Sequence, residues 1–170
     1  RSHVTALVRD DEVIGVRPQG REPLGIAFDL GTTTVAAWLV SLRTGETLAS
    51  RGTLNPQVTF GEDVMSRIRY ATEHGGETLR RSILEALNRL IEQAVDDPEE
   101  VAEVVIAGNT VMHHLVLGLP VNQLGMAPYR PAACDPADIK ARDLGLRAAR
   151  GAYVHCLPNV AAFVGGDHVA

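Results

Sequence analysis

The run from Val101 to Ala107 constrains the fold of this chain more than any other stretch, because six of its seven residues are apolar. A short and nearly continuous apolar run is typical of a strand that is buried on both faces of a sheet. Such a strand needs neighbouring strands beside it and further layers above and below it. The run therefore predicts a layered α/β domain.

Three strands are predicted before this run, and short polar turns separate them. They are Leu24 to Asp29, Val35 to Leu42 and Glu46 to Leu54, with turns at Gly31 to Thr34 and at Thr44-Gly45. Strands that are joined by tight turns form an antiparallel meander. The meander and the later apolar run together predict a mixed sheet.

Apolar residues at helical spacing follow the meander in two places. Val64, Ile68 and Ala71 lie on one face of a first predicted helix. Thr59 and Glu62 before it fit a capping box, in which a hydroxyl and a carboxylate satisfy free backbone amides. A second helix is predicted from a longer stripe made of Leu79, Ile83, Leu87, Leu90 and Ala94.

The rest of the chain alternates helix and strand patterns around a loop rich in proline and glycine. Val111 to Leu117 predicts a short helix, 118–136 the loop, and 137–144 another helix. A last strand is predicted over 152–157 and a last helix over 159–164. The expected fold class is therefore α/β, with a mixed sheet, an antiparallel three-stranded meander and helices on both faces.

The first 23 residues have a different pattern from the rest. Two apolar runs, Val4 to Val8 and Val13 to Val16, flank a charged turn and predict a hairpin, and a segment typical of a linker follows. We expect residues 1–23 to be the tail of a preceding domain with its linker, and residues 24–170 to be one folded unit. The chain starts without methionine and stops at Ala170 without a polar run, which indicates a piece of a longer polypeptide.

Composition excludes several classes of function. The 170 residues are 45% apolar and 22% charged, as in a folded domain, and no apolar stretch approaches the length of a membrane-spanning helix. The net charge of −5 and the aromatic content of 4% argue against nucleic acid as a partner. We expect neither a nucleic-acid partner nor a membrane partner.

The two cysteines, Cys134 and Cys156, fit no zinc or iron–sulfur spacing. We expect them to be free and partly buried side chains. Nothing in the sequence resembles a signal peptide, so the expected compartment is the reducing cytoplasm.

One segment carries the clearest chemistry. A predicted strand brings Asp29 to its end, and the chain then turns through Gly31 into Thr32, Thr33 and Thr34. Successive amides in such a turn form a concave nest for an anion. A carboxylate beside a phosphate repels it unless a divalent cation lies between them, so the pattern predicts a phosphate site with Mg²⁺ held by Asp29, directly or through water. A plain hairpin, with the aspartate capping its own turn, is the open alternative.

Asp29-Leu-Gly31-Thr32-Thr33-Thr34 resembles the first phosphate loop of the acetate and sugar kinase, Hsp70 and actin ATPase superfamily. Other stretches resemble one branch of it, the reductive activators of corrinoid proteins. They are Leu54-Asn55-Pro56-Gln57, Gly61 to Ile68, Ala107 to His114, Pro128 to Pro131 and Leu157 to Ala161. The likeness covers the chain from Leu24 to its end, and it implies a ribonuclease H-like (actin-like ATPase) lobe.

The resemblance implies an ATP-dependent activator that helps return a corrinoid protein of a methyltransferase system from Co(II) to Co(I). It implies ATP and Mg²⁺ as cofactors, Asp29 as the catalytic, metal-organising carboxylate, and Gly31, Thr32, Thr33 and Thr34 as the phosphate-binding residues. A second ATPase lobe of the same polypeptide and a 2Fe-2S cluster that supplies the electron would lie outside this chain. The chain itself then corresponds to the first lobe.

Several other residues in these stretches have two interpretations. Asn109 follows the buried run and is expected to contact the nucleotide, the metal or the other lobe, or simply to cap the next helix. His113 and His114 point in different directions on a helix, so we expect one in the core and one at the surface. Asp63 and Arg67 have the spacing of an ion pair on a helix surface.

Two more stretches lie where contacts with partners are expected. Asn55 to Gln57 and Glu62-Asp63 follow the third strand, near one loop end of the lobe, where they would touch the corrinoid protein or the second lobe. Helix capping is the alternative for Glu62, and the ion pair with Arg67 is the alternative for Asp63. Gly165 to Asp167 is either an exit from a helix or an approach to phosphate.

Other functions stay open on the sequence. One is a kinase, or an activator of another enzyme, within the same superfamily; a kinase would phosphorylate an acceptor. Another is a ribonuclease H-like module that binds proteins and has no ATPase activity, and such a module would not bind Mg-ATP. We expect ATP hydrolysis from the whole protein rather than from this lobe, because half a cleft binds a ligand weakly.

Overall fold

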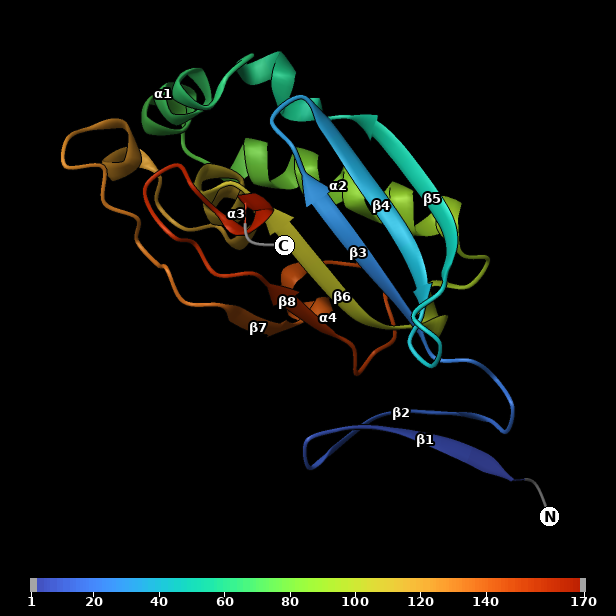
Figure 1. The fold of residues 1–170 in the computed structure, drawn as a ribbon. Helices are drawn as coiled ribbons and strands as arrows, with labels where there is room; N and C mark the ends of the chain where they lie inside the picture. Colours follow the sequence, from blue (N-terminus) through green and yellow to red (C-terminus); the bar gives the residue numbers. More distant parts are fainter. Residues whose placement is uncertain (1–2, 169–170) are drawn as a thin grey trace.

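The computed structural model describes residues 3–168, which form a small hairpin sheet and a six-stranded sheet backed by helices (Figure 1). The strands are β1 (Val4–Arg9), β2 (Glu12–Pro18), β3 (Leu24–Leu30), β4 (Thr34–Ser41), β5 (Thr47–Leu54), β6 (Val101–Gly108), β7 (Ala137–Lys140) and β8 (Tyr153–Cys156). The order in the large sheet is β5-β4-β3-β6-β8-β7. β6 runs parallel to β3 and to β8, and the other neighbours are antiparallel.

The helical elements follow the strands in the expected alternation up to the long loop. They are α1 (Val64–His74), α2 (Glu77–Ala94), α3 (Thr110–Leu117) and α4 (Ala141–Leu144), with the 3-10 turns η1 (Pro56–Phe60), η2 (Pro98–Glu100), η3 (Asn122–Gly125) and η4 (Gly166–His168). Within residues 3–168, no helix combines the length and the apolarity that crossing a bilayer requires.

The α/β class, the mixed sheet and the antiparallel meander are confirmed. β3, β4 and β5 pair as the meander, and β6 joins the other side of β3. This is the order of a ribonuclease H-like sheet. The N-terminal hairpin of β1 and β2 is also confirmed, with its own two-stranded sheet.

One face of the large sheet carries the hydrophobic core. Phe28 and Leu30 of β3 point to this face and are buried, as is Leu87 of α2. Figure 1 shows α2 and α3 behind the sheet. The start of the segment after α4 lies against α2, because Asn88 Nδ2 donates to the carbonyl oxygen of Gly145 over 3.0 Å.

The opposite face is covered less completely. Trp38 of β4 keeps 37% of its surface exposed there, and Val105 of β6 is half-buried. Among residues 3–168, α2 and α3 lie on the face that carries the core, and the 3-10 turn η4 contacts β6. The run from Val101 to Ala107 is accordingly buried on one face and partly open on the other.

Two predicted helices in the second half of the chain are wrong. Residues 137–140 are strand β7, because Ala137 pairs with Cys156 and Lys140 with Tyr153 at the edge of the sheet; only 141–144 are helical. Residues 159–164 form no helix, and the N–H groups of Val160 and Ala161 both donate to the carbonyl oxygen of Val164 in a tight turn. Local composition predicts neither the pairing of residues 137–140 with a distant strand nor the turn at residues 160–164.

The capping box of α1 lies four residues later than predicted. The Asp63 carboxylate accepts from the N–H of Ser66 over 2.7 Å, and the Ser66 hydroxyl accepts from the N–H of Asp63 over 3.2 Å. Thr59 instead lies in η1, and Glu62 is exposed. The reciprocal pair is the same device with different residues.

The two cysteines are free, as expected, but they are not alike. Cys156 is buried in the core, and burial raises the pKa of its thiol to about 12, whereas Cys134 is exposed on the long loop. The expectation that both are partly buried is therefore wrong.

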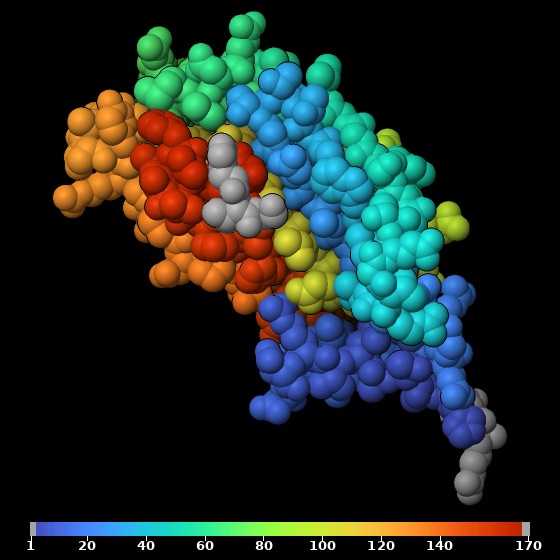
Figure 2. Space-filling view, viewed as in Figure 1, coloured from blue at the N-terminus to red at the C-terminus, as the bar shows by residue number. Residues whose placement is uncertain are grey.

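The N-terminal hairpin lies against the end of the large sheet that is opposite to the β3–β4 turn (Figure 2). Arg9 pairs with Glu103 over 3.2 Å and with Asp138 over 2.6 Å. Glu12 accepts from Lys140 Nζ over 2.8 Å and from the Tyr153 hydroxyl over 2.6 Å. Charged contacts at this surface therefore dock the hairpin on the sheet.

Candidate functional site

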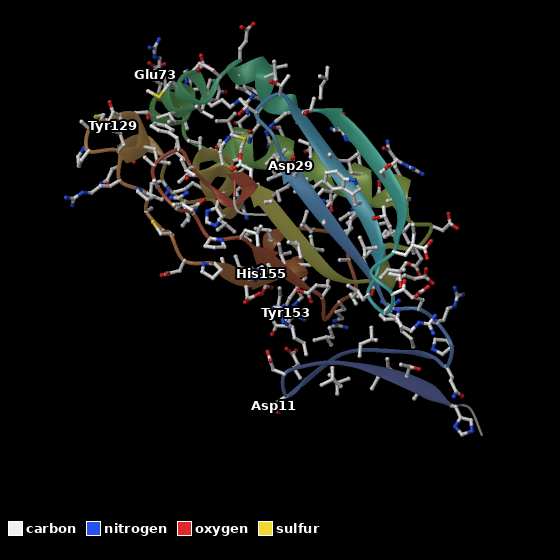
Figure 3. The ribbon with its side chains drawn as sticks, viewed as in Figure 1. Asp11, Asp29, Glu73, Tyr129, Tyr153 and His155 are labelled. Carbon is white, nitrogen blue, oxygen red and sulfur yellow. The ribbon has the colours of Figure 1, made fainter. Side chains whose placement is uncertain are left out.

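The β3–β4 turn places the predicted carboxylate at the edge of the sheet. Asp29 is the last residue but one of β3 and lies opposite Ala36 of β4 and Ala107 of β6. Its side chain is exposed and belongs to the open face of the sheet, as Figure 3 shows. Gly31 to Thr33 then form the turn. The structure thus brings together Asp29 and the predicted phosphate-binding residues.

Gly31 permits the tight geometry of this turn. A β-carbon at this position would lie 2.6 Å from the carbonyl oxygen of Thr34, a separation that real β-carbons do not show. Any other residue would push the strand ends apart. Glycine is therefore required here by close approach of the backbone.

Three successive carbonyl groups of the turn are held from the protein interior. Asn55 Nδ2 donates to the carbonyl oxygen of Gly31 over 2.8 Å, and the N–H of Asn55 donates to that of Thr33 over 2.8 Å. Between them, Arg67 Nη2 donates to the carbonyl oxygen of Thr32. The turn is consequently fixed from behind, while its other side faces outward.

Asn109 joins the turn to helix α3. Its side-chain oxygen accepts from the N–H groups of Val111 and Met112 over 3.0 and 3.1 Å, so Asn109 is the N-cap of α3. Its Nδ2 donates to the hydroxyl of Thr32 over 3.3 Å. Capping, one of its two predicted roles, is therefore present, and the same side chain also reaches the turn.

The electrostatics of the turn suit a divalent cation. Partial desolvation raises the pKa of Asp29, and the negative charge of Asp167 raises this pKa further. The sequence left two roles open for Asp167, an exit from a helix or an approach to phosphate. Two carboxylates that disfavour each other's charge are stabilised when a cation lies near them. Asp29 therefore fits a Mg²⁺ ion, which is bound through one or two carboxylates together with phosphate oxygens and waters.

Among the described residues, no group of three or more His, Cys, Asp or Glu side chains forms a metal cage. A site for Mg²⁺ at Asp29 would thus be an open one, completed by the ligand. This agrees with the preference of Mg²⁺ for few protein ligands.

The segment after β8 lies on the N-terminal end of α3. The Thr110 hydroxyl donates to the carbonyl oxygen of Ala161 over 2.6 Å. At Gly165, a β-carbon would lie 2.2 Å from the carbonyl oxygen of Gly108, so only glycine fits this contact. The segment is therefore in backbone contact with the end of β6 and with Asn109.

Both histidines of α3 are buried, which corrects the expectation that one is at the surface. His114 donates through Nδ1 to the carbonyl oxygen of Thr110 over 2.8 Å and accepts at Nε2 from the N–H of Ala132 over 2.9 Å. His113 Nδ1 accepts from Asn159 Nδ2 over 3.0 Å. Burial, and then the neighbouring His114, lower the pKa of His113 to about 4, so it is neutral near pH 7.

Arg67 does not form the predicted surface pair with Asp63. It is fully buried, and its Nε donates to the carbonyl oxygen of Gly61 over 2.9 Å. Asn55 and Gln57 are buried beside it rather than exposed to a partner. The sequence did not predict the contacts of Asn55 and Arg67 with the turn, because charged and amide side chains near a helix are usually solvated. Gln57 lies behind them and bonds to the carbonyl oxygen of Leu79 and to Arg67. The position of all three within the resembling stretches was the available signal.

The chain belongs to the family described as the RACo middle region, whose model matches residues 24–170. The corrinoid activation enzyme RamQ of Eubacterium limosum is similar, with 36% identity over 180 aligned residues that cover all of this chain and 30% of RamQ. The [Co(II) methylated amine-specific corrinoid protein] reductase of Methanosarcina barkeri is 29% identical over 103 residues, which are 61% of this chain and 19% of the reductase.

A solved structure shows the same fold. It is described as a reductive activator for corrinoid, iron-sulfur protein, and it superposes with a TM-score of 0.87 at 36% identity, covering 91% of this chain and 26% of that chain. The present chain thus spans about a third or less of the length of the proteins it resembles.

Proposed function

We propose that this chain is the first nucleotide-binding lobe of an ATP-dependent reductive activator, which helps return a corrinoid protein from Co(II) to Co(I). The observation that carries the proposal is the β3–β4 turn, where Asp29 ends a strand beside a turn whose carbonyl groups are tied to the interior. Family membership over residues 24–170 and the names of the similar proteins support the corrinoid protein as the partner.

The turn binds the phosphates of ATP in this proposal. Gly31 lets the strands approach, and the outward amides and hydroxyls of Thr32, Thr33 and Thr34 donate to phosphate oxygens. Thr33 and Thr34 are exposed, so their side chains are accessible to a ligand. Asn109 holds Thr32 in place through its 3.3 Å bond and thereby ties the start of α3 to the bound phosphates.

Asp29 organises the metal. It would hold Mg²⁺ directly or through water, opposite the phosphates, and the ion supplies the positive charge that allows a carboxylate and a phosphate to share one site. Asp29 is the catalytic carboxylate in this role. The described residues supply no assigned general base, and groups of the second lobe would complete the site.

The remaining assignments follow from the same proposal. Residues 1–23 are the tail of a preceding domain with its linker, residues 24–170 are the first lobe, and a second lobe of the same polypeptide closes over the nucleotide. The electron comes from a 2Fe-2S centre outside this chain, since the chain has two cysteines and such a cluster takes four protein ligands. The free cysteines support a reducing cytoplasm as the compartment.

The test is ATP hydrolysis by the complete protein that contains this chain, with an Asp29→Asn variant and an Asp11→Asn control. Asp11 lies in the exposed hairpin turn, far from Asp29 (Figure 3). We expect hydrolysis to fall close to the background rate in Asp29→Asn and to stay unchanged in Asp11→Asn. Wild-type turnover in Asp29→Asn would contradict the role of Asp29.

The same variant has a second readout. Because the pKa of Asp29 is raised, ionising its carboxyl group costs more free energy in the folded protein than in the unfolded chain. The folded protein therefore loses stability as the pH rises through the folded pKa of Asp29. Asp29→Asn removes this cost. Without nucleotide at pH 7, we expect its melting temperature to exceed that of the wild type, while its activity is lost.

A further inference from the structure

A polar cluster without an assigned function lines the interior side of the β3–β4 turn. We call the side chains of Asn55 and Arg67 the clamp, since each donates to a carbonyl oxygen of the turn. Both are buried, with exposed fractions of 1% and 0%. Both side chains also contact the sulfur of Met112, which lies 3.7 Å from Asn55 Nδ2 and 3.4 Å from Arg67 Nη1.

The clamp sets the direction of the amides in the turn. In a planar trans peptide, the C=O and the following N–H point to opposite sides. Because the carbonyl groups of Gly31, Thr32 and Thr33 point to the interior, the N–H groups of Thr32, Thr33 and Thr34 point outward. The described residues offer no hydrogen-bond acceptor to the N–H groups of Thr32 and Thr33. These donors are therefore available to an external anion.

Arg67 also places a charge behind the turn. Within residues 3–168 it forms no ion pair; its guanidinium donates to the carbonyl oxygens of Gly61 and Thr32 and to Oε1 of Gln57, the last over 3.4 Å. Arginine keeps its charge even when buried. A cation bonded to the carbonyl of Thr32 polarises that peptide and makes the N–H of Thr33 a stronger donor. The clamp therefore favours negative charge on the outward side.

We propose that Asn55 and Arg67 are positioning residues for the phosphate-binding turn, and that Arg67 strengthens the binding of phosphate oxygens through the Thr32–Thr33 peptide. The inference rests on the proposed function, because it assigns an anion to the outward side of the turn. It adds a specific element to that function: the affinity for the phosphate part of the nucleotide is set from the protein interior, by side chains that never touch the ligand.

The test measures binding of Mg-ATP and of adenosine by calorimetry, using the complete protein that contains this chain. Arg67→Met removes both the charge and the donor, and Arg67→Lys keeps the charge. We expect Arg67→Met to weaken Mg-ATP binding about tenfold or more, as for a lost hydrogen bond to a charged group, while adenosine binding changes less than about twofold. Arg67→Lys should fall between Arg67→Met and the wild type.

A second variant keeps the test decisive if Arg67→Met does not fold. Asn55→Asp retains the side-chain oxygen that accepts from the N–H of Gln57 over 2.9 Å, but it loses the donor to Gly31 and places a carboxylate beside Arg67. It should fold and should lose affinity for Mg-ATP selectively. Ile68→Ala is the matched control, since Ile68 is the buried neighbour of Arg67 on α1 and its side chain lies beside Gly125 of η3.

The possible outcomes separate the clamp from the function it serves. Equal losses for Mg-ATP and adenosine, or a loss in Ile68→Ala as large as in Arg67→Met, would mean general distortion and would overturn the inference. Unchanged Mg-ATP affinity in a folded Arg67→Met or Asn55→Asp variant would overturn it as well. A wild-type protein that binds no Mg-ATP would instead refute the proposed function itself.

Discussion

The two ends of the large sheet are held to their neighbours by opposite kinds of polar contact. At the end with the β3–β4 turn, Asn55, Arg67 and His113 are buried. Asn55 and Arg67 bond to backbone carbonyl groups of the turn, and His113 bonds to the side chain of Asn159. At the other end, Arg9 of the hairpin pairs with Glu103, and Lys140 of the sheet pairs with Glu12 of the hairpin, and these side chains are partly exposed. One end is built for fixed geometry, and the other for docking.

The physical consequence is a difference in what each end responds to. Buried contacts are little screened by salt, and losing one partner leaves a polar group without water. Exposed ion pairs contribute little to stability and are weakened by salt. The turn end should therefore be sensitive to acid and to substitution, whereas the hairpin end should be sensitive to salt.

Acid should have the largest effect, and it should act at the turn end. His113 titrates near 6.5 in the unfolded chain and has a pKa of about 4 in the folded protein, so the unfolded chain binds more protons between these values. The stabilising contribution of neutral His113 is therefore complete above its unfolded pKa of 6.5 and is lost as the pH falls toward its folded pKa of about 4. We expect the free energy of unfolding to drop by about 2 kcal/mol from pH 7 to pH 5, measured by urea denaturation.

Removing the buried imidazole tests the origin of the acid effect. His113→Gln should flatten the dependence of stability on pH, measured by the same urea denaturation. An equally steep pH dependence in His113→Gln would contradict the assignment of the effect to this buried side chain.

Substitution of the helix cap should have the next largest effect. Asn109→Ala removes the acceptor for two amides of α3 and the bond to Thr32, so the free energy of unfolding should fall by about 1 kcal/mol. Asn109→Asp keeps the cap and loses only the donor to Thr32. We expect it to restore most of the stability but not the nucleotide affinity, as denaturation and calorimetry would show. Full affinity in Asn109→Asp would mean that the bond to Thr32 does not matter.

The hairpin contact should show the smallest effect. In a double-mutant cycle with Arg9→Ala and Glu103→Ala, we expect a coupling energy below about 1 kcal/mol, because both side chains are partly exposed. About 1 M NaCl should remove most of this coupling, since it shortens the screening length to about 3 Å. A coupling that persists in salt would show that the hairpin end is as rigidly held as the turn end.

The sequence predicted the elements whose signals are local. The meander, the apolar stripe of α2, the position of Asp29 at a strand end and the cap at Asn109 all follow from periodicity or from the chemistry of one turn. These signals act over a few residues, so a linear pattern contains them. Phosphate and metal binding at Asp29 stays a prediction.

The sequence could not predict the elements that depend on distant partners. Arg67 resembles a solvated residue of α1 until its acceptors, the backbone carbonyls of Gly61 and Thr32, are known. Residues 137–140 have a helix-like composition and become a strand only because β8 lies beside them. The burial of both His113 and His114 likewise depends on the segments around Ala132 and Asn159, which bond to these side chains.

Gly165 has a mechanical meaning that follows from its bare contact with the end of β6. A side chain between two segments can change its rotamer when one segment is displaced. At Gly165 no side chain lies between the segments, because the backbone contacts the backbone of Gly108 and Asn109 directly. The segment around Gly165 is therefore coupled directly to the backbone of Gly108 and Asn109. Because Asn109 also bonds to Thr32, we expect a displacement of this segment to reach the β3–β4 turn.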